Sequence, residues 1–196
     1  MAKVVVTEFV SVDGVIEDPG GVEGWERGGW AFQFDRGPDG DQFKLDEVMA
    51  ADALLLGRVT YEGFAEAWPS REGEFADKFN GMEKYVVTDS MREADWNNTT
   101  VVKGSELVDT VAALRRRDGG DILVNGSAQL VRALADDGLV DEYRLMVFPV
   151  VLGGGKKLFT DTDATTALTL VDSRPAGECL ILIYEPAAPT GSADAA

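Results

Sequence analysis

Histidine is absent from this chain of 196 residues, and cysteine occurs once, as Cys179. Catalytic triads with a histidine base, zinc sites with imidazole ligands and disulfide bonds within the chain are therefore excluded. Basic residues are scarce as well, because 18 Lys and Arg stand against 35 Asp and Glu and give a formal charge of -17. Such a charge repels nucleic acids and anionic membranes, so neither is an expected partner.

Long hydrophobic runs are also missing. The N-terminus lacks the apolar segment of a signal peptide, and no window approaches the length of a membrane span. Cys179 lies in an apolar run, where a reduced thiol acts as a small buried hydrophobe. We therefore expect a cytoplasmic protein without a metal site. A hydrophobic content of 45% favours one domain with a substantial core.

The most informative stretch of the sequence is residues 52–62. The uninterrupted apolar run 53–56 predicts a strand covered on both faces, and Gly57 permits a tight turn beside a ligand. The helix that follows presents free amides, to which Arg58 and Thr60 add donors for phosphate. This pattern predicts a site for a phosphate-bearing cofactor. The alternative is a glycine used for packing and an arginine on a solvated helix face.

A second junction repeats this pattern. The strand 121–124 stops at Asn125-Gly126-Ser127-Ala128, and a helix follows from Gln129 to Ala135. Strands and helices alternate along most of the chain, which implies a mostly parallel sheet with helices on both faces. Ligands of such sheets bind outside the carboxyl ends of the strands.

The remaining elements complete this α/β interpretation. Further strands are expected at 3–10, 84–88, 99–103, 141–151, 168–173 and 178–184, and further helices at 41–51, 72–82 and 104–117. No helix separates the last three strands, so they should pair antiparallel at one edge. Residues 1–185 are expected to form one domain, and residues 186–196 a disordered tail.

A long glycine-rich stretch, residues 17–40, contains several aromatic side chains, Trp30 among them. A connection of this length without structure of its own is typical of a lid or a binding loop. Trp30 is therefore a candidate for contact with a flat substrate. The alternative is that the aromatic side chains pin the loop to the body of the protein.

The order of these motifs resembles the dihydrofolate reductase-like superfamily, and most closely its branch with the RibD C-terminal domain, the reductase of riboflavin biosynthesis. Residues 56–62 resemble the Gly-Arg-x-Thr signature that binds NADPH phosphates in that family. The other matching segments are 11–16, 86–88, 101–103, 125–128 and 149–155. The similarity covers roughly residues 3 to 185.

The resemblance implies a three-layer α/β fold with a mostly parallel central sheet, helices on both faces and antiparallel C-terminal strands. It also implies an NADPH-dependent reductase that transfers hydride to a small flat heterocycle, similar to a pterin or dihydrofolate. Two alternatives remain, an aminopyrimidine reductase of the riboflavin type and a nucleotide-binding protein without turnover. NADH is the alternative cofactor.

The resemblance also implies roles for individual residues. The cofactor would be bound by Gly57, Arg58, Thr60, Thr88, Lys103, Gly126, Ser127, Ala128 and Gln129. Asn125 stands where riboflavin-pathway reductases carry a substrate-binding Glu. Asp13 and Asp41 are the candidate catalytic acids; the second is reached by counting back from residues 56–62 to the preceding helix. Ser127 replaces the second glycine of the family's pair.

The same resemblance raises a question of cofactor choice. Asp89 occupies a position where relatives place Ser or Arg, and an acid there opposes a 2′-phosphate. Arg92 is a cation that could compensate for it.

A homodimer is a further expectation. Both faces of the strand 141–151 are apolar, and three strands without an intervening helix leave an edge or face to protect. Pairing with a second copy through the C-terminal strands would protect it. Helices of the same chain are the alternative.

Overall fold

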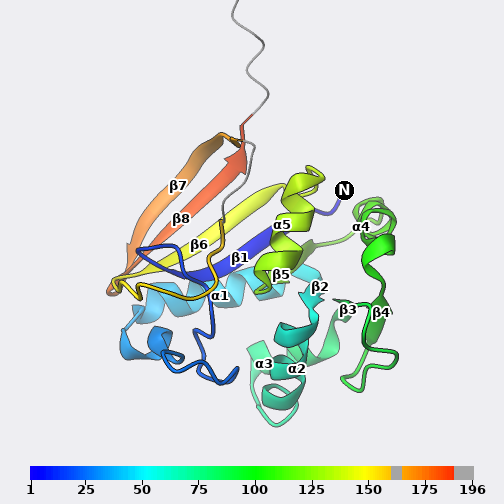
Figure 1. Cartoon of the computed structure of the whole chain (residues 1–196), viewed down its shortest axis with the longest axis horizontal. Coiled ribbons are helices and arrows are strands. Elements are labelled where there is room, and N and C mark those ends of the chain that lie inside the picture. The colour runs from blue at the N-terminus through cyan, green and yellow to red at the C-terminus, as the bar shows by residue number, and fades with distance from the viewer. Residues whose placement is uncertain (160–164, 188–196) are drawn as a thin grey trace, which may run out of the picture.

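A computed structural model describes residues 1–159 and 165–187 of the chain (Figure 1). One sheet in the order β4-β3-β2-β5-β1-β6-β8-β7 runs through the described part. Neighbours from β4 to β6 are parallel, whereas β8 is antiparallel to both β6 and β7. The strands are β1 Val4–Ser11, β2 Ala51–Gly57, β3 Glu83–Val87, β4 Thr99–Val102, β5 Asp121–Asn125, β6 Glu142–Phe148, β7 Leu168–Ala176 and β8 Cys179–Pro186.

Helices cover both faces of this sheet. Side chains of α4 and α5 pack with alternate residues of β1 and β5, while α1, α2 and α3 pack with the intervening residues on the other face. Figure 1 shows α5 crossing in front of the sheet and α1 behind it. The helices are α1 Gly37–Ala50, α2 Arg58–Ala67, α3 Glu74–Gly81, α4 Leu107–Arg115 and α5 Ala128–Asp136, with short 3-10 turns at Trp30–Gln33 and Gly104–Glu106. The predicted three-layer fold is confirmed.

The C-terminal strands form the antiparallel edge that the sequence predicts. Met146 of β6 and Ile181 of β8 are buried against Phe43 of α1, so a helix of the same chain covers one face of these strands. The outermost strand, β7, exposes Leu170 and Val171. Pro186, which was expected in the disordered tail, is the last residue of β8. Residues 188–196 of that expected tail lie outside the described residues.

No helix in the described ranges has the length and apolar character needed to cross a membrane. The same residues contain no cluster of three or more His, Cys, Asp or Glu side chains arranged to hold a metal ion.

Candidate functional site

A cavity of about 1320 Å³ lies at the carboxyl edge of the sheet, where β1 and β5 separate. The two strands pair only as far as Thr7 and Asn125, because β5 ends there while β1 continues to Ser11. Such a point of divergence is where open α/β sheets receive ligands. Residues from β1, α1, α2, α3, α5 and the loop after Ser11 contribute to the cavity wall.

The two strand-to-helix junctions predicted from the sequence meet at this cavity. A side-chain carbon added at Gly57 would collide with the Ser127 hydroxyl, and one added at Gly126 would lie 2.6 Å from Thr60 Oγ1. The start of α2 is therefore in contact with the turn before α5. Close approach of this kind requires glycine at both positions. The first turns of both helices lie beside the same space, where their free amides suit an anion.

The turn before α5 has a left-handed backbone at two successive residues, with φ of 61° at Gly126 and 65° at Ser127. Serine adopts this conformation less readily than glycine. Its hydroxyl caps the helix, because Ser127 Oγ accepts a hydrogen bond from the Leu130 amide at 3.4 Å. Ser127, Ala128 and Gln129 all line the cavity.

The other predicted cofactor residues follow the same edge in strand order. Thr88 comes directly after β3 and is buried, and Lys103 comes directly after β4 and is exposed. Arg58, at the start of α2, is ion-paired with Glu62 at 2.9 Å and is half exposed. Its guanidinium thus lies outside the cavity wall but beside the junction. Together with Gly57, these residues form a row of donors along three strand ends.

Asp89 lies at the end of this row. Its Oδ1 accepts a hydrogen bond from the Gly104 amide at 3.1 Å, directly after Lys103. The carboxylate therefore faces the stretch of edge where Thr88 and Lys103 offer donors. Its charge is the feature of this row that opposes a phosphate.

The floor of the cavity holds a buried polar cluster. Lys44 Nζ donates to Thr7 Oγ1 at 2.6 Å and forms an ion pair with Glu47 at 2.5 Å, and the Thr7 hydroxyl also contacts Glu47. Lys44 in addition lies 5.4 Å from the centre of the Phe9 ring. The Lys44 charge is thus neutralised from within α1 and β1.

Next to this cluster, two buried acceptors have no partner. Glu8 Oε1 and Asn125 Oδ1 make no hydrogen bond within the described residues, and both side chains line the cavity. Only 6% of Glu8 is exposed. Burial raises the pKa of Glu8 to about 8, against the opposing effects of Lys44 and the Gly126 amide. Buried acceptors without partners are rare and often mark a ligand site.

Sequence reasoning missed Glu8, although a signal was present. An acid at the centre of the apolar strand 3–10 is unusual, because strands covered on both faces carry few charges.

The two acids predicted from the sequence are both engaged in other contacts. The Asp13 carboxylate accepts hydrogen bonds from the Ser11 hydroxyl and from the Leu152 and Gly153 amides, and these lower its pKa to about 2. Asp13 thereby anchors the glycine-rich loop after β6 and is a poor proton donor near neutral pH. Asp41 does line the cavity, but its side chain is exposed and ion-paired with Arg36 at 2.5 Å.

The loop between β1 and α1 has an internal framework. The buried Asp18 carboxylate accepts hydrogen bonds from the Val22, Glu23 and Trp25 amides. Trp30 is fully buried edge-on against Phe148, and its indole donates to the Glu17 carbonyl at 2.9 Å. The Trp30 side chain therefore pins the loop to the core and does not line the cavity, unlike the role in substrate binding that the sequence suggested for it.

Aromatic side chains form the wall opposite the loop. Phe64 of α2 and Trp68, directly after α2, meet Phe75 and Phe79 of α3, with Trp68 stacked on Phe75 at a centroid distance of 5.1 Å. Aromatic walls of this kind suit a flat apolar ring.

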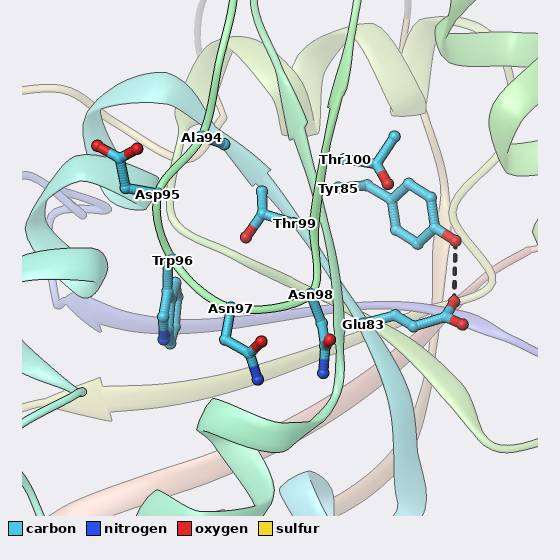
Figure 2. Close-up of a pocket in the computed structure, with 9 residues that line it drawn as sticks. All are labelled: Glu83, Tyr85, Ala94, Asp95, Trp96, Asn97, Asn98, Thr99 and Thr100. Atoms are coloured by element: carbon cyan, nitrogen blue, oxygen red, sulfur yellow. Dashed lines mark hydrogen bonds between the residues drawn. The ribbon is translucent and has the colours of Figure 1, made fainter.

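A second hollow, of about 620 Å³, lies at the opposite end of β3 and β4. Figure 2 shows its lining, in which the Tyr85 hydroxyl donates to Glu83 at 2.9 Å and Trp96 belongs to the loop before β4. Beneath it, Lys84 is completely buried, yet its amine donates to the carbonyls of Asn80, Met82 and Asn97.

The sequence matches one known protein family over nearly its whole length. A profile described as the RibD C-terminal domain matches residues 2–182. The uncharacterized protein YyaP of Bacillus subtilis is 29% identical over 177 residues, which cover 88% of each chain.

Solved structures share the fold at low identity. A protein from Shewanella sp. PV-4 assigned to riboflavin biosynthesis superposes with a TM-score of 0.76 at 21% identity, covering 96% of this chain and 100% of that one. Dihydrofolate reductase from Enterococcus faecalis, solved with NADP(H), gives a TM-score of 0.58 at 16% identity and covers 95% and 97%.

Proposed function

This chain belongs to the RibD C-terminal domain family, and on that premise we propose that it is an NADPH-dependent reductase that transfers hydride to a small flat heterocycle, similar to a pterin or dihydrofolate. One observation carries the proposal: two glycine-dependent strand-to-helix junctions are in contact beside a cavity at the carboxyl edge of the sheet. That arrangement offers amide donors for phosphate next to an enclosed space for a ring.

The residues present fit a dinucleotide. Gly126 leaves room that a side chain would fill, and the amides of Ala128 and Gln129 begin a helix with no acidic residue in its first turn. Gly57, Arg58, Thr60, Thr88 and Lys103 would hold the phosphates and the adenosine half along the strand ends. When bound, the nicotinamide supplies a hydride. NADH is the alternative cofactor, because Asp89 disfavours a 2′-phosphate.

The substrate side of the cavity supports a flat heterocycle. The aromatic wall of α2 and α3 offers stacking surface, and the buried acceptors Glu8 and Asn125 suit ring N–H groups. An aminopyrimidine of the riboflavin type would use the same features, with Asn125 in place of an acid. A nucleotide-binding protein without turnover remains the third possibility.

The test is oxidation of NADPH, and separately of NADH, followed with the purified protein. Dihydrofolate and an aminopyrimidine are offered in turn, and a reaction without either serves as the control. We expect NADPH oxidation that depends on the added heterocycle. Tight binding of NADPH without oxidation by either compound would favour the nucleotide-binding alternative. Absence of binding by both nucleotides would contradict the proposal.

We also propose a homodimer formed through the C-terminal strands. The outer strand β7 has no neighbour on its far side within the described residues, and Leu170 and Val171 are more than half exposed on it. An exposed strand edge with apolar side chains is a pairing surface. Light scattering at micromolar concentration should give twice the 21.1 kDa of one chain. A mass of one chain across dilution would contradict this proposal.

A further inference from the structure

We infer that Glu8 is the catalytic proton donor of this reductase site and that Asn125 accepts a hydrogen bond from an N–H group elsewhere on the same heterocycle. The inference deepens the proposed function and rests on it. It replaces Asp13 and Asp41, the acids that the sequence suggested, with a residue on the central strand.

Glu8 and Asn125 lie where β1 and β5 stop pairing. Glu8 follows Thr7, the last residue of β1 that pairs with β5, and Asn125 is the partner of Thr7 in that pairing. Successive side chains of a strand point to opposite faces, so Glu8 lies on the face opposite Thr7 and Asn125, and the two side chains flank the gap where the strands separate. Both line the cavity.

Glu8 and Asn125 both have unused hydrogen-bonding capacity. Glu8 is more than nine-tenths buried, and its Oε1 has no partner among the described residues. Asn125 Oδ1 is likewise a buried atom without a hydrogen-bond partner among the described residues. Acceptors left unbonded in the interior cost free energy, so a ligand that supplies N–H groups would be strongly favoured there.

The charged neighbours of Glu8 explain why its proton is retained. Lys44, on α1, is the nearby cation, but Thr7 and Glu47 hold its amine. Glu23, in the loop after β1, is a negatively charged neighbour that also raises the pKa of Glu8. The charged neighbours of Glu23 are Asp18, Glu17 and Lys156. With no ion pair to Glu8 in the described part of the chain, burial dominates and raises its pKa to about 8. The carboxyl is therefore largely protonated at neutral pH.

The chemical step assigned to Glu8 is the protonation that accompanies reduction of a C=N bond. Reduced nicotinamide, when bound, would supply a hydride to the carbon of the substrate's C=N bond, and the nitrogen would take the proton from the Glu8 carboxyl. The products are the reduced amine, oxidised nicotinamide and the Glu8 carboxylate. Solvent returns the proton through the cavity mouth before the next turnover.

Two variants test the assignment with dihydrofolate as the probe. Glu8→Gln keeps the shape but has no acidic proton, and we expect turnover to fall by about a hundredfold or more while the NADPH dissociation constant is unchanged. The wild-type rate should decline as pH rises through about 8, and this decline should be absent from the residual activity of Glu8→Gln. Asn125→Ala should raise the KM for dihydrofolate and retain the decline of the rate as pH rises. Glu66→Gln, on the exposed side of α2, is the matched control.

A readout without turnover separates this inference from the proposed function. In protein with carbon-13 at the glutamate carboxyls, one resonance should titrate near pH 8 in the wild type and be missing from Glu8→Gln. A Glu8 carboxyl that is ionised at neutral pH would overturn the inference, whether or not the protein is a reductase. Full activity of Glu8→Gln with an intact pH profile would overturn it while leaving the reductase function standing.

Discussion

One ionisable side chain is buried near the amino ends of the strands and another near their carboxyl ends, and the hydrogen bonding of the two differs. At the amino end, Lys84 is wholly buried, but three carbonyls accept hydrogen bonds from its amine. The Lys84 Nζ also lies 4.4 Å from the centre of the Trp96 ring. At the carboxyl end, Glu8 keeps an oxygen without a partner. A buried ionisable group with all its hydrogen bonds made holds the structure together, whereas one with an unused acceptor is available to a ligand.

The surroundings of the two residues reinforce the contrast. Lys84 ties the end of α3 to the loop before β4, so each of its bonds joins parts of the chain. Glu8 makes no ion pair in the described structure, its Oε1 has no partner, and it lines the cavity. We therefore assign stability to the amino end and chemistry to the carboxyl end.

The largest expected effect concerns stability at Glu8. Its folded pKa of about 8 lies above the ordinary 4.5, so its favourable contribution is complete below pH 4.5 and is lost as pH rises through 8. Glu8→Gln does not titrate. Its free energy of unfolding should therefore exceed that of the wild type by an amount that grows across this range, up to about 5 kcal/mol. Urea unfolding at several pH values measures it, and a constant difference would contradict the burial of a neutral acid.

Contact between the two junctions is tested by Gly57→Ala. The backbone at Gly57 is ordinary, so the added methyl acts only through its collision with Ser127 and should cost about 1 to 3 kcal/mol of stability. Ser127→Gly in the same chain should restore most of the loss, because it removes the obstacle and suits the left-handed backbone. Ser127→Ala should restore little, since the Ser127 side-chain carbon is itself 2.5 Å away. If Ser127→Gly and Ser127→Ala restored stability equally, the two junctions would not be in the contact described.

The amino end is tested by Lys84→Met. Loss of three hydrogen bonds should destabilise the protein by about 2 kcal/mol at neutral pH and leave NADPH binding unchanged. Burial lowers the pKa of Lys84 to about 8, so its contribution is present above pH 10.5 and is lost as pH falls through 8. The free energy of unfolding of the wild type, relative to that of Lys84→Met, should thus increase as pH rises. This is the reverse of the trend at Glu8. Weakened NADPH binding would show that the two ends are coupled.

Removal of the Arg58 guanidinium should affect binding and spare folding. Charge-assisted bonds to phosphate contribute roughly 1.5 to 3 kcal/mol each, so Arg58→Ala should weaken NADPH about tenfold or more. Arg116→Ala, just after α4, is the matched control. An unchanged dissociation constant for Arg58→Ala would remove the start of α2 from the site.

The smallest effect is expected at Asp89. Asp89→Ser should strengthen NADPH about two- to fivefold and hardly change NADH, because an exposed charge interacts weakly with a phosphate. Asp95→Asn, in the hollow at the amino end, should change neither nucleotide. Equal responses of NADPH and NADH to Asp89→Ser would show that Asp89 does not face the 2′-phosphate.

Much of the fold was predictable because apolar runs and glycine positions determine it locally. The run 53–56 with Gly57 after it, and the run 122–124 before Gly126, became β2 and β5 at the expected places. The start of α1 was harder, since Gly37 and Gly40 concealed a helix that begins before Asp41. The contact between the two junctions is a tertiary feature that no single motif contains.

The candidate site was less predictable than the fold. Asp13 and Trp30 are conspicuous in the sequence, yet their bonds are to loops of the same chain. Glu8 is marked in the sequence only as an acid within an apolar strand, and the oxygen that lacks a partner is seen only in the structure. Sequence reveals residue types, whereas missing bonds are visible only once the neighbours are in place.

The most direct test of the account is calorimetric titration of NADPH into the wild type and into Gly126→Val. The valine would crowd Thr60 at a left-handed residue in the junction beside the cavity. Circular dichroism and urea unfolding would establish that the variant is folded. The account predicts saturable binding of NADPH to the wild type with one site per chain, and loss of that binding in a folded Gly126→Val. Binding of equal strength to both proteins would contradict it, because the nucleotide would then lie away from the junctions.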